Sequence, residues 1–180
     1  RIIDLLGVDA KEPTNTDTKR QTYGNNRYSQ SNLDQWLNDD GLNWWTATHA
    51  YDAAPTDAGL NQPVGYDDKL GFKSNFTTEE LAAVLDTTIR VAKNTFTDGG
   101  SYEDVVRKFF IPSTTELNLA NENSIAEGVV LSAYSGAADA ARIAYATQAV
   151  ITNTLSASKP ASTAAARYYW LRTPYSAYSR

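Results

Sequence analysis

Two Ser/Thr-x-x-Glu motifs constrain the fold of this chain more than any other feature of its sequence. Thr77 and Glu80 form the first, within NFTTEELAAVLDT, and Ser113 and Glu116 form the second, within KFFIPSTTEL. This spacing is typical of a capping box, in which both side chains bond backbone N–H groups at the start of a helix. The first motif therefore predicts a short helix over residues 78–86, and the second predicts another helix that starts at Ser113.

Apolar runs beside these helix starts predict strands. Residues 1–8 (RIIDLLGV) predict a buried first strand, residues 87–96 (TTIRVAKNTF) a second and residues 109–111 a third. Residues 97–102 (TDGGSY) predict a turn, and residues 167–175 (RYYWLRTPY) predict the last strand. Aromatic segments near both ends and capped helices between them indicate one compact body of sheet and helices.

The segment YSQSNLDQWLN predicts one more short helix. Ser29 is its expected cap, and Leu33, Trp36 and Leu37 fall on one face at helical spacing. Asp39 and the residues after it end the helix.

Two long stretches lack a clear period. Residues 41–72 predict a long ordered loop, which is unusual enough to suggest a functional role. Residues 124–166 are rich in Ala, Ser and Thr, and only residues 141–150 predict a helix there. Because the chain shows neither a repeat nor a linker, we expect one domain over residues 1–180.

Charge and cysteine content exclude several classes of function. Sixteen Lys and Arg against 21 Asp and Glu give a net charge of −5, without a basic cluster, which argues against nucleic-acid and anionic-membrane partners. No apolar run reaches the roughly 18 residues that span a bilayer, so we expect a soluble chain. The absence of cysteine excludes disulfides, thiolate metal sites and a cysteine nucleophile.

The single histidine is the first candidate for chemistry. His49 lies near Asp52 and Asp57 in the long loop, which is compatible with a metal or acid–base site and also with a structural role. No nucleophile elbow, HExxH motif or EF-hand accompanies it. We therefore expect a structural or capping role for His49, with no catalytic residue, no metal and no cofactor.

Clustered acids and amides are the second candidate. A glycosidase needs two carboxyl groups on opposite sides of a sugar, which adjacency in sequence does not indicate. Asn121, Glu122 and Asn123 have side chains that ligate calcium, but turn formation explains them as well, and we favour the turn. The adjacent acid pairs are most simply solvated turn residues or caps: Asp39/Asp40, Asp67/Asp68 and Glu79/Glu80.

Aromatic residues are the third candidate. Trp44 and Trp45 lie in the long loop, where an exposed ring stacks on a sugar or on a partner protein. The alternative is that one or both rings pack on the core and fix the loop.

The order of these segments resembles a known pattern. YGNNRYSQSNLDQWLN, WWTATHAYDAAP, GFKSNFTTEEL, KFFIPSTTEL, LANENSIAEG and YYWLRTPYS resemble, in the same order, an uncharacterised domain family of gut bacteria and their phages. The equivalents in that family read YSxSNIRQWLN, VFLLSxxEV and WWLRSP. The resemblance covers almost the whole chain. It implies an α+β fold of the C-type-lectin-like kind, with a mixed or antiparallel sheet, which is shared with formylglycine-generating enzymes and with the variable ligand-binding proteins of phages.

This resemblance also implies where a ligand binds. In the family, WLRSP precedes a Ser/Tyr/Gly-rich stretch and a closing GVRPAL strand, and neither is present here. Together with the start at Arg1 and the absence of methionine, this predicts a piece of a longer protein, whose sheet is completed by further residues or by another chain. Arg172, Tyr175 and Tyr178 would stand at the start of the binding surface.

The expected function follows from the resemblance and from the missing chemistry. Formylglycine-generating enzymes use cysteines, which this chain lacks, and EPTN at residues 12–15 matches the calcium-dependent sugar motif only weakly. We expect a non-enzymatic, homo-oligomeric head-fibre, decoration or receptor-binding protein of a virion, or a bacterial-surface protein. Its expected partners are other assembly subunits and a host cell-surface glycan or protein. The alternatives are a carbohydrate-active enzyme that uses Asp52, Asp57 or Glu122, and an architectural subunit completed by a strand from another chain.

Overall fold

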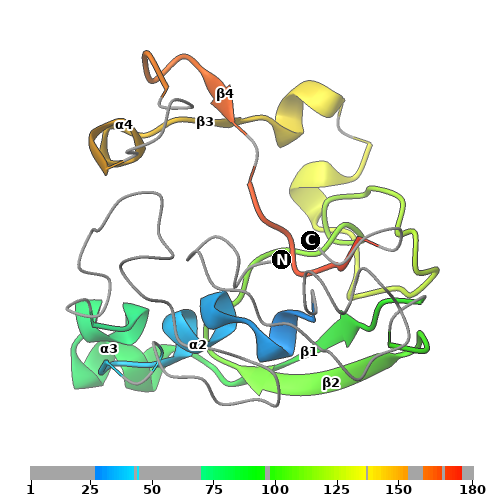
Figure 1. The fold of residues 1–180 in the computed structure, drawn as a ribbon, viewed down its shortest axis with the longest axis horizontal. Coiled ribbons are helices and arrows are strands. Elements are labelled where there is room, and N and C mark those ends of the chain that lie inside the picture. The colour runs from blue at the N-terminus through cyan, green and yellow to red at the C-terminus, as the bar shows by residue number, and fades with distance from the viewer. Residues whose placement is uncertain are drawn as a thin grey trace, which may run out of the picture.

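The fold combines short helices with two small antiparallel sheets (Figure 1). The computed structural model describes residues 27–42, 44, 70–95, 98–136, 138–153, 160–167 and 169–175. This mixture confirms the predicted α+β class. None of the described helices has the length and apolar character to cross a membrane. In chain order the elements are η2 (Tyr28–Gln30), α2 (Asn32–Asn38), η6 (Phe72–Asn75), α3 (Thr78–Ala83), β1 (Thr87–Ala92), β2 (Tyr102–Arg107), η7 (Ser132–Tyr134), η8 (Asp139–Arg142), β3 (Ala144–Tyr145), α4 (Gln148–Asn153) and β4 (Ala166–Arg167).

An antiparallel hairpin of β1 and β2 forms the base of the fold. Its register runs from Thr87 opposite Arg107 to Ala92 opposite Tyr102. The predicted second strand is therefore confirmed up to Ala92. Gly99, in the predicted turn, has φ 71°, a conformation that L side chains rarely adopt.

The second strand of the hairpin lies upstream of the strand that the apolar run predicts. Residues 109–111 are not in a strand, so that prediction is wrong, and β2 is Tyr102–Arg107 (YEDVVR). Its side chains alternate between exposed and half-buried, which is the pattern of a strand with one covered face. Charged residues hide this pattern, because the half-buried Glu103 and Arg107 are covered through partners that are more than 70 residues away in the sequence.

Helix α2 starts two residues later than predicted. The cap is Ser31, whose Oγ accepts a hydrogen bond from the Asp34 N–H at 3.1 Å. Ser29 lies in the 3₁₀ helix η2 instead, and its hydroxyl donates to the Glu103 carboxylate. The end at Asp39 is as predicted.

Apolar packing joins α2 to the hairpin. The fully buried Tyr28 ring contacts Ile89 and Val91 on the inner face of β1, and burial raises the pKa of its phenol. Leu33 and Val105 pack against this cluster. An aromatic group extends the core with ring centroids 5.0 to 5.3 Å apart; its members are Trp36, Phe72, Phe76 and Phe109.

The two capping boxes have different outcomes. Thr77 and Glu80 form the predicted box, with Thr77 N–H to Glu80 Oε2 at 2.8 Å and Glu80 N–H to Thr77 Oγ1 at 3.2 Å. The helix that follows, α3, ends at Ala83, one turn earlier than predicted. The box at Ser113 also forms, but a turn follows it, because Asn118 at φ 56° leaves the helical conformation.

The C-terminal third differs most from its prediction. The helix expected over residues 141–150 is replaced by η8, β3 and the start of α4. The expected last strand shrinks to β4, which pairs only two residues with β3. Residues 169–175 continue from it without strand pairing and descend onto β1 (Figure 1). The expected strand at 1–8 lies outside the described residues.

Candidate functional site

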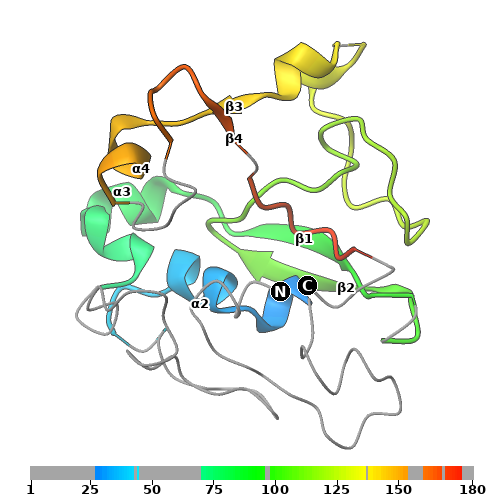
Figure 2. The same cartoon turned by 45° about the horizontal axis from the view of Figure 1, so that its top comes forward.

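The C-terminal segment, residues 169–175, lies along the outer edge of β1, the edge that faces away from β2. Two views show it running beside this strand (Figures 1 and 2). The Arg172 N–H donates to the Pro112 carbonyl at 3.0 Å, which fixes the segment to the chain after β2. The site is therefore built from a strand edge and a segment far from it in sequence.

Two charged side chains bond backbone groups on the outer edge of β1. Lys93 N–H donates to Ser101 O at 2.9 Å. Because the backbone groups of an antiparallel strand alternate in direction, the N–H and C=O groups of Arg90 and Ala92 point away from β2. Of the outward-facing groups, the Arg90 carbonyl accepts from Arg172 Nε at 3.2 Å, and the Ala92 N–H donates to Glu127 Oε1 at 2.8 Å. Arg172 and Glu127 thus occupy the place of a third strand.

The Arg172 guanidinium is buried and fully bonded. It is 1% exposed, and its Nη1 and Nη2 donate to the two Glu116 carboxylate oxygens at 2.7 Å each. Nη1 also donates to Ile111 O at 2.9 Å, and Nη2 to Glu127 O at 2.7 Å. With the bond from Nε, all five guanidinium N–H groups have an acceptor.

The second capping box supplies the counter-charge. Ser113 N–H donates to Glu116 Oε2 at 3.1 Å, and Glu116 N–H donates to Ser113 Oγ at 3.1 Å, so the box orients the Glu116 carboxylate. Gly128 packs beside it at φ 104°, and an added Cβ there would lie 2.8 Å from Glu116 Oε1. The motif that predicts a helix therefore serves mainly to hold Arg172.

Glu127 is the second buried acid of the site. Its Oε2 accepts from Asn121 Nδ2 at 3.0 Å and bonds the Thr173 hydroxyl. Burial raises the pKa of the Glu127 carboxyl, and the hydrogen bonds from Thr173 and the Ala92 backbone partly offset the rise. Its oxygens are thus committed to the backbone of β1 and to the C-terminal segment.

Two asparagines hold the end of the segment. Asn123 Nδ2 donates to Pro174 O at 2.7 Å, and Asn94 Nδ2 donates to Tyr175 O at 2.7 Å. Asn121 Oδ1 accepts from the Asn123 N–H at 2.8 Å, which is the turn that we favour over a calcium site. Within the described ranges, no three His, Asp or Glu side chains gather in a way that could hold a metal ion.

The fixed segment presents aromatic side chains to solvent. Tyr169, Trp170 and Tyr175 are 41%, 42% and 46% exposed. The Tyr169 hydroxyl donates to Arg142 O at 2.7 Å, which ties its ring to η8. A backbone held by hydrogen bonds and three exposed rings therefore occur together within seven residues.

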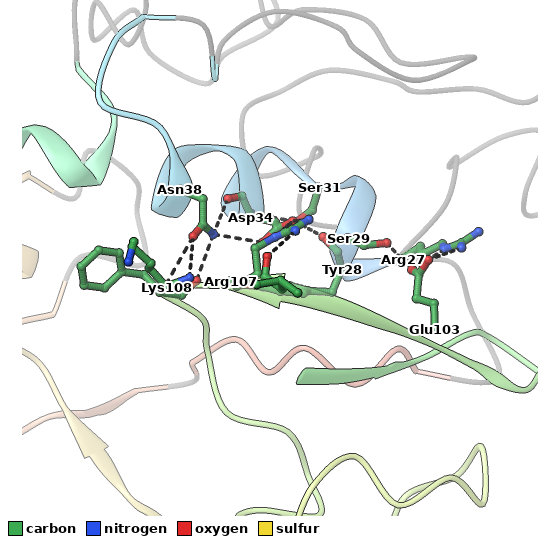
Figure 3. A network of polar contacts seen from close by, with 11 residues as sticks. Arg27, Tyr28, Ser29, Ser31, Asp34, Asn38, Glu103, Arg107 and Lys108 are labelled. Atoms are coloured by element: carbon green, nitrogen blue, oxygen red, sulfur yellow. Dashed lines mark hydrogen bonds and ion pairs between the residues drawn. The ribbon is translucent and has the colours of Figure 1, made fainter. Parts of the chain in front are cut away.

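A second polar network fastens α2 to β2 (Figure 3). Arg107 Nη2 donates to Asp34 Oδ2 at 2.6 Å, and Asn38 Nδ2 donates to Phe109 O at 3.0 Å. Arg27 Nε donates to Glu103 Oε1 at 2.7 Å. Burial acts to raise the pKa of the Glu103 carboxyl, but the hydrogen bonds from Arg27 and Ser29 prevail and lower it. This network is structural and lies on the face of β2 that α2 covers.

The structure places three of the five predicted binding residues. Tyr175 is exposed, as a contact residue requires. Arg172 is buried among its acceptors and does not stand at the surface, where the resemblance puts it. Trp44 is 4% exposed, which is the core position that we gave as the alternative. Trp45 and Tyr178 lie outside the described residues, as do His49, Asp52 and Asp57.

The sequence does not indicate most of the residues whose side chains hold residues 169–175 in place. Glu127 and Asn94 show no local signal, since their partners are distant in sequence. The sequence predicts only a strand position for Trp170, because a run of aromatic and apolar residues indicates burial. The local signal is Arg172 itself, a charged residue within an aromatic run, whereas its partner Glu116 lies 56 residues away.

Comparisons with known proteins assign the chain to a family. The family described as a domain of unknown function (DUF6273) matches residues 4–180. No curated protein and no solved structure matches the chain. Since the family match spans nearly the whole sequence, the site described above lies within it, and the chain belongs to the DUF6273 family.

Proposed function

We propose that this chain is a non-enzymatic recognition module of a phage virion or a bacterial surface, and that it binds a cell-surface glycan. One observation carries the proposal: Tyr169, Trp170 and Tyr175 are exposed on a segment whose backbone is held by buried polar contacts. Flat aromatic rings give a large contact area with little loss of conformational freedom, and Trp and Tyr dominate recognition surfaces.

The arrangement of the acids supports binding over catalysis. Glu116 is committed to Arg172, and Glu127 is committed to Ala92, Asn121 and Thr173. A general acid or base needs a proton-transfer position open to a substrate. These two carboxyl groups face the protein interior instead.

The C-type-lectin-like fold is part of the proposal and rests on the resemblance of the motifs. A fold does not determine function, so recognition is argued from the aromatic side chains. In this proposal the module assembles with other virion or surface subunits as a homo-oligomer, and Trp45 and Tyr178 extend the binding surface.

The test is glycan binding by purified protein on a printed glycan array. We expect retention on a restricted set of glycans, and we expect Trp170→Ala and Tyr175→Ala to abolish it. Tyr102→Ala is the matched control, because Tyr102 is also 42% exposed but lies on β2. A blank array with binding to periodate-treated host cells would instead indicate a protein ligand, and a blank result on both would overturn recognition.

The enzymatic alternative has its own readout. Mass spectrometry of the array-binding glycan after incubation with the protein should show intact glycan. Cleavage that is lost in Glu122→Ala, with folding retained, would overturn the non-enzymatic proposal, since Glu122 is the one exposed candidate acid that the structure describes.

One observation favours an architectural subunit as a second candidate. The N–H groups of Tyr102 and Asp104 face away from β1, and no described residue accepts a hydrogen bond from either. An open strand edge accepts a strand from another chain. Cross-linking within the native particle, followed by peptide mapping, would support this candidate if β2 is joined to a neighbouring subunit, and an unlinked β2 would oppose it.

A further inference from the structure

We infer that Arg172 is the positioning residue of the recognition surface: from beneath, its guanidinium fixes the backbone that carries Trp170 and Tyr175. This inference rests on the proposed function and deepens it. Arg172 is buried, so it contacts no ligand and acts through its exposed neighbours.

The segment depends on side chains for its position. In the described part of the chain, residues 169–175 form one backbone hydrogen bond to the rest of the fold, from Arg172 N–H to Pro112 O. A paired strand of this length would form several bonds. Here the register of the segment is set by side chains, of which Arg172 bonds the largest number of groups.

Arg172 joins four parts of the molecule that are distant in sequence. Its donors reach β1 at Arg90, the chain after β2 at Ile111, the capping box at Glu116 and the loop at Glu127. A shift of the segment along β1 would break several of these bonds at once. The site therefore has one favoured register.

A lysine at position 172 cannot form the same set of hydrogen bonds. The planar guanidinium offers five donors in a fixed fork, whereas an ammonium group offers three donors around one point. Holding the segment before a ligand arrives also removes the entropic cost of ordering it on binding. The expected effect of Arg172→Lys is thus on the order of the segment and on affinity.

The first test needs no ligand. Hydrogen exchange of the intact chain is compared for the wild type, Arg172→Lys and Arg90→Lys, at a temperature well below unfolding. We expect Arg172→Lys to speed exchange of the amide of residue 172, which donates to Pro112 O, by about tenfold or more, because the side-chain hydrogen bonds that hold the segment are lost, while the amides between β1 and β2 keep their rates. Arg90→Lys alters only the exposed ion pair with Asp104 and should leave hydrogen exchange in the segment unchanged.

Two outcomes of this test would overturn the inference. Unchanged exchange of the residue-172 amide would show that the Arg172 side chain does not hold the segment. Equal acceleration in the segment and the hairpin would show a general contribution to stability. If Arg172→Lys does not fold, Glu116→Gln weakens the same fork from the other side and is scored by the same two criteria.

The second test separates the inference from the proposed function. On the printed glycan array, Arg172→Lys should lower retention on the wild-type glycans without changing their identity, and Arg90→Lys should match the wild type. Local loss of protection without any glycan binding would leave the positioning role standing and would overturn the proposed function. Glycan binding that is insensitive to Arg172→Lys would support the proposed function and would overturn the positioning role of Arg172.

Discussion

Two arginine–carboxylate pairs lie at β1, each a fork of two parallel hydrogen bonds, and they differ in burial. The Arg172–Glu116 fork has side chains that are 1% and 14% exposed, whereas the Arg90–Asp104 fork, on the outer face of the hairpin, is 39% and 42% exposed. Arg90 takes part in both, since its side chain bonds Asp104 and its carbonyl accepts from Arg172. Water solvates and screens the exposed pair, whereas the buried pair must keep all of its partners, so the buried pair is the one that holds separate segments of this chain together.

The largest effect should follow from removing the buried guanidinium. Arg172→Ala leaves Glu116 without its cation and removes the Arg172 donor from the Arg90 and Ile111 carbonyls, while the Glu127 carbonyl keeps only its bond from the Ser113 hydroxyl. We expect a loss of about 3–5 kcal/mol in the free energy of unfolding, measured in urea. Arg90→Ala should cost clearly less, and equal losses would contradict the contrast between the two forks.

A glycine beside the buried fork gives the next effect. Gly128→Ala places a methyl group against Glu116 and adds strain at φ 104°, so we expect a loss of about 1–3 kcal/mol in unfolding free energy. Gly136→Ala is the matched control, because Gly136 also has positive φ, at 69°, but an added Cβ meets nothing within 4 Å. Similar losses at both positions would assign the effect to backbone strain alone.

The pH dependence of stability should reveal Glu127. Because burial raises its pKa, the folded chain keeps this proton to a higher pH than the unfolded chain, whose glutamates titrate near about 4.3. The contribution of Glu127 is therefore fully present below that pH and is lost as pH rises through the folded pKa.

Glu127→Gln removes this titration and leaves the other acids unchanged. The stability of the wild type relative to this variant should be highest near pH 4 and should decline toward pH 7, in urea unfolding series on both proteins. A relative stability that rises with pH would contradict the assignment.

The smallest effect should come from the exposed fork. Asp104→Asn removes its carboxylate charge, whose pKa is lowered by the Arg90 guanidinium. Because water solvates both partners, we expect a change in melting temperature close to the measurement error, and one that vanishes at high salt. A salt-independent loss as large as that of Gly128→Ala would show that exposure does not separate the two forks.

Local signals in the sequence predicted local structure. Both capping boxes form, since a box needs only residues three apart. The hairpin was half predicted, because β1 is apolar enough to indicate a strand while β2 carries three charges whose partners lie far away. The helix expected after Ser113 is cut short by a left-handed Asn118, which sequence pattern does not indicate.

The site was predicted less completely than the fold. The aromatic run indicates the C-terminal segment correctly, but it also predicts a strand there. The resemblance places the Arg172 side chain at the surface, whereas the structure buries it. Burial of Arg172 depends on Glu116 and Glu127, which are 56 and 45 residues away. No pattern within a short window connects such residues.

The closure of the β1 edge has a consequence for the behaviour of the chain in concentrated solution. Unpaired strand edges are templates for uncontrolled association between chains, and proteins block them with charge or by covering them. Arg172 and Glu127 place charged groups on the edge of β1 and also cover it. Loosening the C-terminal segment would thus promote aggregation of the protein, even where most of the fold survives.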